Sequence, residues 1–127
     1  MTSPSPAVRP RDLPLSADLM RKLLVQTADL PGADFRVLTF YVTAAPLGET
    51  VRETAKTVAE TVKISRGSTS KSISRLLAEG WLSRVFRVGT VPFYRVGDKV
   101  LELAAEEADV EQLAPVRHLP VRGFVDE

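Results

Sequence analysis

The chain has 127 residues, of which 44% are hydrophobic, and this size and composition predict one domain with a core of workable size. The net charge is +1 and Cys is absent, which excludes disulfides, Cys-ligated zinc and thiol catalysis. No apolar run approaches the roughly 20 residues that span a bilayer, and no signal peptide is visible, so we expect a cytoplasmic protein.

Residues 1–14 are predicted to form a flexible arm, because four prolines spaced through them forbid a helix interior. Ser16 can cap an N-terminal helix within residues 15–30, which Pro31 and Gly32 then break. The residues expected on its buried side are Leu19, Met20, Leu23 and Leu24. A further helix is predicted over residues 33–45, where it opens the domain core. Its apolar residues are Phe35, Leu38, Tyr41, Val42 and Ala45.

A capping box predicts the start of the next helix, over residues 50–63. Thr50 can cap it, while Glu53, three residues on, reaches back to the backbone N–H of the cap. Its apolar residues recur on one stripe of a 3.6-residue period. They are Val51, Ala55, Val58, Ala59 and Val62.

Ser65 is a good N-cap for a helix over residues 65–80, which Gly80 ends. The inward face of this helix is predicted to consist of Thr69, Ile73, Leu76 and Leu77. The opposite side of the helical wheel carries short hydroxyls and cations, namely Ser68, Lys71, Ser74 and Arg75. Such a face suits hydrogen bonding to phosphates and base edges.

A β-hairpin is predicted over residues 81–96, because β-branched and aromatic residues flank a short turn at Gly89-Thr90. Pro92 cannot donate a ladder hydrogen bond, so it belongs at a strand start or on an edge. Trp81 and Phe86 lie at the junction between helix and hairpin, where we expect core residues rather than base-stacking ones.

Asp98 is a plausible cap for a C-terminal helix over residues 98–114, whose acidic residues are expected to form a solvated face. The ordered domain is thus predicted to span residues 15–114, followed by a loose tail over residues 115–127. Charge is uneven along the chain: residues 50–96 hold nine Lys/Arg against three Asp/Glu, and residues 97–127 hold three against eight. The centre is therefore basic and the C-terminal part acidic.

Catalytic chemistry has little to be built from in this sequence. The single histidine, His118, lies in the tail between prolines, so neither a Ser-His nor a metal-His site is indicated. The glycines are too scattered to form a phosphate-binding loop. We expect no enzyme activity, no metal and no cofactor.

The segment from Val58 to Leu82 resembles the helix-turn-helix of MarR-type winged-helix transcriptional regulators. The residues in matching places are Ala59, Val62, Ile64, Ser65, Ile73, Leu76 and Gly80. The resemblance implies an α+β, mainly α fold: a winged helix-turn-helix with an N-terminal helix and one C-terminal helix. Lys63 stands where the family usually has Gly, so either this Lys adopts a left-handed conformation or the turn is built differently.

The resemblance further implies that residues 65–80 enter the major groove of double-stranded DNA and that the hairpin is a basic wing on the backbone. The candidates for the groove are Arg66, Ser68, Ser70, Lys71 and Ser74. The candidates for phosphates are Lys63, Arg75, Arg84 and Arg87. Family habit also implies a homodimer and leaves room for a small-molecule effector, which no residue identifies.

We therefore interpret the chain as a sequence-specific transcriptional regulator of the bacterial cytoplasm, associated with the nucleoid. The chain has no Asn and 12 Arg against 5 Lys, a bias that we assign to a GC-rich bacterial genome. Two alternatives remain. One is a plasmid or phage replication or maintenance factor that also binds DNA, and the other is a winged helix that serves as a protein-protein interaction module.

Overall fold

The computed structural model describes residues 15–113, with side chains through residue 106. The predicted arm (1–14) and tail (115–127) lie outside the described residues. The elements in chain order are α1 (Ala17–Gln26), α2 (Gly32–Thr43), α3 (Ala55–Val62), α4 (Arg66–Glu79), β1 (Leu82–Val88), β2 (Val91–Val96) and α5 (Asp98–Leu113). This is a mainly helical α+β architecture, as the sequence predicts.

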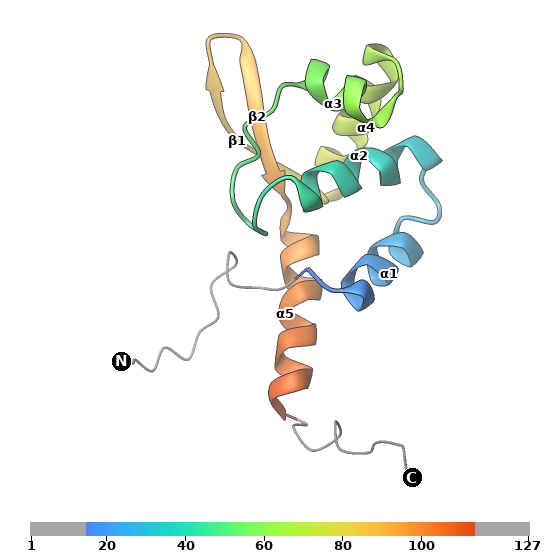
Figure 1. The fold of residues 1–127 in the computed structure, drawn as a ribbon, viewed down its shortest axis with the longest axis vertical. Helices are drawn as coiled ribbons and strands as arrows, with labels where there is room; N and C mark the ends of the chain where they lie inside the picture. Colours follow the sequence, from blue (N-terminus) through green and yellow to red (C-terminus); the bar gives the residue numbers. More distant parts are fainter. Residues whose placement is uncertain (1–14, 114–127) are drawn as a thin grey trace.

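Three helices and a hairpin form the centre of the molecule. α2 packs on α3 and α4, α4 leads directly into β1, and α2 also contacts β2. The hairpin projects beside α3 and α4 at one end of the molecule, while α5 runs toward the other end with α1 beside it (Figure 1). This order is that of a winged helix-turn-helix: three helices, α2, α3 and α4, are followed by a two-stranded wing. α1 and α5 are added at its ends.

One continuous core joins these elements. Leu38 and Tyr41 from α2, Leu76 from α4 and Tyr94 from β2 all belong to it, and Tyr41 and Tyr94 meet edge to face at 6.1 Å between ring centroids. Trp81, predicted as a core residue, is only 3% exposed. Because α1 adds Leu19 and Leu23 to the same cluster, the N-terminal helix is part of the folded unit.

The first helix has the predicted cap, but its buried face is narrower than expected. The backbone N–H of Leu19 donates to Ser16 Oγ at 3.0 Å. Leu19 and Leu23 are fully buried, whereas Leu24 is 53% exposed, so its predicted burial is wrong. Leu24 lies about 100° around the helix from Leu23, beyond the side that the rest of the protein covers. The second helix begins at Gly32, one residue before the predicted start.

The predicted start of the third helix is wrong by several residues. α3 begins at Ala55, and its cap is Thr54, whose side chain accepts from the N–H of Thr57 at 3.2 Å. Val51 is extended, and its N–H donates to the Tyr94 carbonyl at 2.9 Å in an isolated β-bridge. The free edge of β2 offers this acceptor, so pairing across the fold prevails over the capping-box pattern of Thr50 and Glu53.

The backbone conformation of Lys63 decides between the two structures that the sequence leaves open for the turn between α3 and α4. Lys63 has φ 63° and ψ 45°, a left-handed conformation, so the turn keeps its usual shape without glycine. Ser65 caps α4 as predicted by accepting from the Ser68 N–H at 3.0 Å. Gly80 ends α4 at φ 87°.

The hairpin has the predicted strands and turn, with one irregularity. Its register shifts between Arg84 and Phe86, so Val85 is an extra residue in β1, a β-bulge. Phe86 is half-buried and lies outside the core cluster, so its predicted core position is wrong. Its ring packs against Phe93 at 5.4 Å between centroids, on the side of the hairpin away from Tyr94.

The last helix follows the wing after a single residue. Asp98 is the first residue of α5 rather than its cap. Val100 and Ala104 are buried against the core, while Glu102 and Glu106 are exposed, as a solvated acidic face requires. None of the helices that the structure describes is both long and apolar enough to cross a membrane.

Candidate nucleic-acid interface

The exposed side of α4 gathers every side chain that the sequence assigns to the groove. Ser65 fixes the start of the helix, so the residues that follow are presented in a defined order. Arg66, Ser68, Ser70, Lys71 and Ser74 are all exposed. Together they form a surface of hydroxyls and cations, which provides donors, acceptors and positive charge on one rigid element.

Arg75 has a partner that the sequence does not predict: its guanidinium pairs with Asp34 of α2, while the side chain stays 41% exposed. Its Nε donates to Asp34 Oδ2 and its Nη2 donates to Asp34 Oδ1, each at 2.8 Å. Ser72 Oγ donates to Asp34 Oδ1 at 2.6 Å. The sequence missed this ion pair of Arg75, and the contact of Arg75 with a phosphate stays a prediction.

Asp34 and Ser72 were not identified from the sequence. Asp34 is fully buried in the first turn of α2, and Ser72 is fully buried on α4. Periodicity places Ser72 next to the apolar residues of α4, but a Ser at such a position gives no sign of its partner. The one available signal is an acidic residue among the apolar residues of α2. This signal is easily missed, because an acidic residue in the first turn of a helix is already explained by the helix dipole.

The pKa of the Asp34 carboxyl reflects two opposed effects. Burial by itself raises this pKa, while the hydrogen bonds from Arg75 and Ser72 and the charge of Arg75 lower it. The partners prevail, and the pKa of Asp34 lies below its ordinary value of 3.8. The hydrogen bond and charge of Asp34 also raise the pKa of Arg75. At neutral pH the pair is ionised on both sides.

Lys63 projects from the turn between α3 and α4, next to the N-terminus of α4. Its side chain is exposed, and its backbone N–H donates to the Ala59 carbonyl at 2.9 Å. Arg36 from α2 donates to the Val62 carbonyl, which also secures the end of α3. The backbone of the turn is thus fixed while the Lys63 ammonium is directed to solvent.

The bulge in β1 determines where the wing cations point. Arg84 opposes Tyr94 and Arg87 opposes Pro92. These two partners are two residues apart on β2, so they lie on the same face of the strand. Arg84 and Arg87 therefore share one face of the hairpin, although a spacing of three residues in a regular strand would place them on opposite faces. Both are exposed. On the other face, the Arg52 guanidinium lies over the Phe86 ring, 5.4 Å from its centroid.

Ion pairing separates two groups of cations. Arg75, Arg95 and Lys99 have carboxylate partners in Asp34, Asp98 and Glu79 respectively. Nine other cations have no carboxylate partner within residues 15–106. Four of them lie elsewhere on α1, α2, α3 and the segment before α3, namely Arg21, Arg36, Arg52 and Lys56, and the remaining five are Lys63, Arg66, Lys71, Arg84 and Arg87. All five project from the helix-turn-helix or the wing, so this end of the molecule carries uncompensated positive charge.

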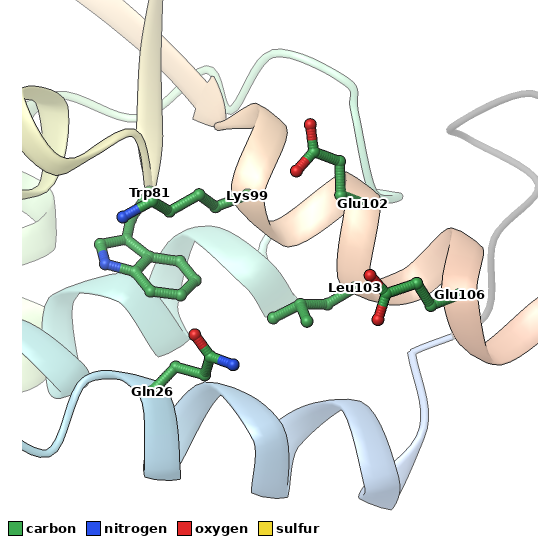
Figure 2. A pocket seen from close by; sticks show the side chains of 6 residues that line it. All are labelled: Gln26, Trp81, Lys99, Glu102, Leu103 and Glu106. Atoms are coloured by element: carbon green, nitrogen blue, oxygen red, sulfur yellow. The ribbon is translucent and has the colours of Figure 1, made fainter.

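A small pocket lies at the other side of the core, between α1 and α5. Figure 2 shows Gln26 from α1 and Leu103 from α5 on its two sides, with Trp81 at one end. Its volume is about 140 Å³, and Lys99 Nζ lies over the Trp81 ring, 5.0 Å from the centroid. Across the residues with described side chains, no group of three or more His, Cys, Asp or Glu is placed to hold a metal ion.

No protein-family model matches this sequence, and no curated protein sequence is significantly similar to it. Similar solved structures include RV1404 from Mycobacterium tuberculosis, which is 12% identical; the match covers 85% of this chain and 75% of that one, with a TM-score of 0.50. A type III plasmid segregation TubR mutant is 14% identical over 76% of this chain and 98% of that one, also with a TM-score of 0.50.

A third similar structure is the MarR family transcriptional regulator SPO1453 from Silicibacter pomeroyi DSS-3, at 16% identity, 80% and 71% coverage and a TM-score of 0.48. The element order, the capped α4 and the two-stranded wing described above decide the architecture. The resemblance of residues 58–82 to winged-helix regulators is confirmed at the level of the fold: this chain is a winged helix-turn-helix protein.

Proposed function

We propose that this protein is a sequence-specific DNA-binding protein that acts as a transcriptional regulator in bacteria. The observation that supports this function is the position of five exposed cations on the turn, α4 and the wing, each without a carboxylate partner among residues 15–106: Lys63, Arg66, Lys71, Arg84 and Arg87. An exposed cation without a partner remains available to a phosphate, whereas a paired one must first give up its carboxylate.

In this proposal, α4 enters the major groove with its N-terminal half. Arg66 and Lys71 can donate to guanine, while the hydroxyls of Ser68, Ser70 and Ser74 can both donate to and accept from base edges. The positive end of the α4 dipole also favours a phosphate near Ser65. Lys63, Arg84 and Arg87 contact phosphates and so supply affinity without sequence information.

A homodimer presents two copies of α4 to half-sites about one helical turn apart, roughly 34 Å along the duplex. Such a protein acts on the nucleoid in the cytoplasm. A small-molecule effector is compatible with this function, and we assign it no residue.

The test is fluorescence anisotropy with a mixed-sequence duplex over a series of salt concentrations, comparing the wild type with the variant Lys71→Ala/Arg87→Ala. Counterion release predicts that log Kd rises linearly with log salt and that the variant binds more weakly, with a slope reduced by about one, because Arg87 is assigned to a phosphate and Lys71 to a base. The variant Arg21→Ala/Lys22→Ala removes two charges of the same sign from α1 and should keep the wild-type slope. Equal binding by all three proteins would instead point to the protein-interaction alternative.

A plasmid or phage replication or maintenance factor is the second candidate, because the plasmid segregation protein TubR has a similar fold over 98% of its length. It predicts the same DNA-binding surface and differs in the DNA that it recognises. Selection of bound fragments from total cellular DNA separates the two: promoter fragments support the regulator, and fragments of a plasmid or phage origin or partition site support the alternative.

A further inference from the structure

Asp34 is the one charged residue among the fully buried residues that the structure describes. Its carboxylate accepts three hydrogen bonds, two from Arg75 and one from Ser72, all of which come from α4. A buried carboxylate is costly unless it is paired and hydrogen-bonded, and here the contact between α2 and α4 supplies every partner. The cluster therefore ties α4 to α2 at one defined point.

This cluster adds directional contacts to the apolar packing of α2 and α4. Val37 and Leu38 on α2 and Ile73 and Leu76 on α4 contribute to the same core cluster, and contacts of this kind tolerate small rotations and shifts. Hydrogen bonds fix both distance and angle. Ser72 and Arg75 are three residues apart on α4, so two successive turns of the helix are held by the same carboxylate.

Each α4 residue that bonds to Asp34 directly follows an exposed residue. Lys71 precedes Ser72, and Ser74 precedes Arg75, so any rotation of α4 about its axis moves Lys71 and Ser74 directly. A buried ion pair often contributes little to stability compared with apolar residues of similar volume. The pair can still matter for the orientation of α4, because a small displacement of a recognition helix misaligns every base contact at once.

We propose that Asp34 is a positioning residue for DNA recognition: through Ser72 and Arg75 it sets the orientation of α4 and thereby the preference for one DNA sequence over another. This inference rests on the proposed DNA-binding function. It assigns Arg75 to the α2–α4 contact in place of the predicted phosphate contact, because Asp34 compensates the charge of Arg75. Affinity for DNA of arbitrary sequence then depends on the other cations.

The experiment uses the full chain and two duplexes of equal length: one selected by the wild type from a random pool, and one of mixed sequence. The main variant, Asp34→Asn/Arg75→Gln, removes both charges and leaves the net charge unchanged. The matched control is Glu79→Gln/Lys99→Gln, which neutralises the exposed ion pair between α4 and α5, where Lys99 Nζ and Glu79 Oε1 are 4.0 Å apart. Circular dichroism establishes that each variant is folded at the binding temperature.

In the main variant, the ratio of the two dissociation constants should fall about tenfold, equivalent to the loss of one base contact. Its affinity for the mixed duplex and its salt slope should match those of the wild type, and the control should keep the full ratio. An unchanged ratio in the folded main variant would overturn the inference. A salt slope reduced by about one would overturn it too, because Arg75 would then be a phosphate contact.

A second variant decides the matter if the main variant does not fold. Arg75→Lys keeps both charges but replaces the two-pronged donor that meets both oxygens of Asp34. The inference again predicts a lower sequence preference with an unchanged salt slope, and a wild-type preference would overturn it. Failure of the proposed function looks different: the wild type itself would then show no preference or no binding, and this inference would fall with it.

Discussion

Lys63 combines an unfavourable backbone conformation with a favourable position for binding. Its left-handed φ of 63° costs a residue with a side chain about 1 kcal/mol, which Gly avoids. Replacement by Gly removes this cost, but Gly also has greater backbone freedom in the unfolded chain, which offsets part of the stabilisation. We therefore expect Lys63→Gly to raise the free energy of unfolding by roughly 0.5–1 kcal/mol, as measured by urea denaturation.

The same variant should bind DNA more weakly, with the salt slope reduced by about one, because one phosphate contact is lost. Lys56→Gly is the matched control. Lys56 is an exposed residue inside α3, where glycine should lower the free energy of unfolding by about 1 kcal/mol. A loss of stability in both variants would contradict our account of the turn.

Because of Asp34, the free energy of unfolding should decrease as the pH falls into the acid range. Its pKa in the folded state lies below the ordinary value of 3.8, so the folded protein binds this proton less readily than the unfolded chain does. The contribution of the carboxylate to stability is thus fully present above pH 3.8 and is lost as the pH falls through the folded-state pKa.

Urea denaturation of the wild type and of Asp34→Asn from about pH 7 to about pH 2.5 measures this contribution. We expect the variant to be less stable by about 1–3 kcal/mol at neutral pH, since it loses hydrogen bonds to a buried charge. The difference should shrink below pH 3.8 as the wild-type carboxylate becomes protonated. A difference that stays constant down to the lowest pH would contradict this assignment.

At the scale of elements, the junction between the wing and α5 depends on Gly97. A Cβ at this position would lie 2.2 Å from the Gly80 carbonyl oxygen and 2.8 Å from the carbonyl carbon of Trp81. Both obstacles are backbone atoms, and the Gly97 N–H is already held by the Trp81 carbonyl at 2.7 Å. We expect Gly97→Ala to destabilise the protein by about 3 kcal/mol or more, measured by thermal and urea denaturation.

Gly67→Ala provides the control for this prediction. Gly67 lies in the first turn of α4, and a Cβ there would meet nothing within 4 Å. Because Ala is the better helix former, this variant should be more stable by up to about 1 kcal/mol. If Gly97→Ala were as stable as the wild type, the close approach of the two backbone segments would be wrong.

For the whole molecule, α1 carries the apolar surface on which a dimer prediction can be tested. Leu24 and Val25 are 53% and 65% exposed, and Leu24 also lines an open pocket with Met20 and Phe35. We expect sedimentation equilibrium to show a dimer at micromolar concentration. Leu24→Glu should raise the dimer dissociation constant about tenfold or more, because it places a charge in an apolar contact.

Val88→Glu is the matched control, since Val88 is 64% exposed at the end of β1, and the hairpin projects away from α1 (Figure 1). It should leave the dimer intact. A wild type that remains monomeric at micromolar concentration would remove the prediction of paired half-sites and leave the single-site DNA interface in place.

The identity and order of the elements around the turn can be predicted from the sequence, because their signals are local. The cap at Ser65, the glycine at Gly80 and the apolar period of α4 act within a few residues, and the hairpin turn at Gly89-Thr90 is equally local. The predicted groove residues of α4 are exposed for the same reason: a helical period determines which side chains share a face.

Features that depend on partners far along the chain could not be predicted and became visible in the folded protein. Thr50 and Glu53 form a sound local capping pattern, yet the free edge of β2 draws Val51 into an extended pairing. Arg75 has an outward position on an isolated helical wheel, yet its guanidinium pairs with a carboxylate 41 residues earlier. The bulge at Val85 likewise decides which face Arg84 and Arg87 share. Each outcome depends on an acceptor or a register that propensity and periodicity do not contain.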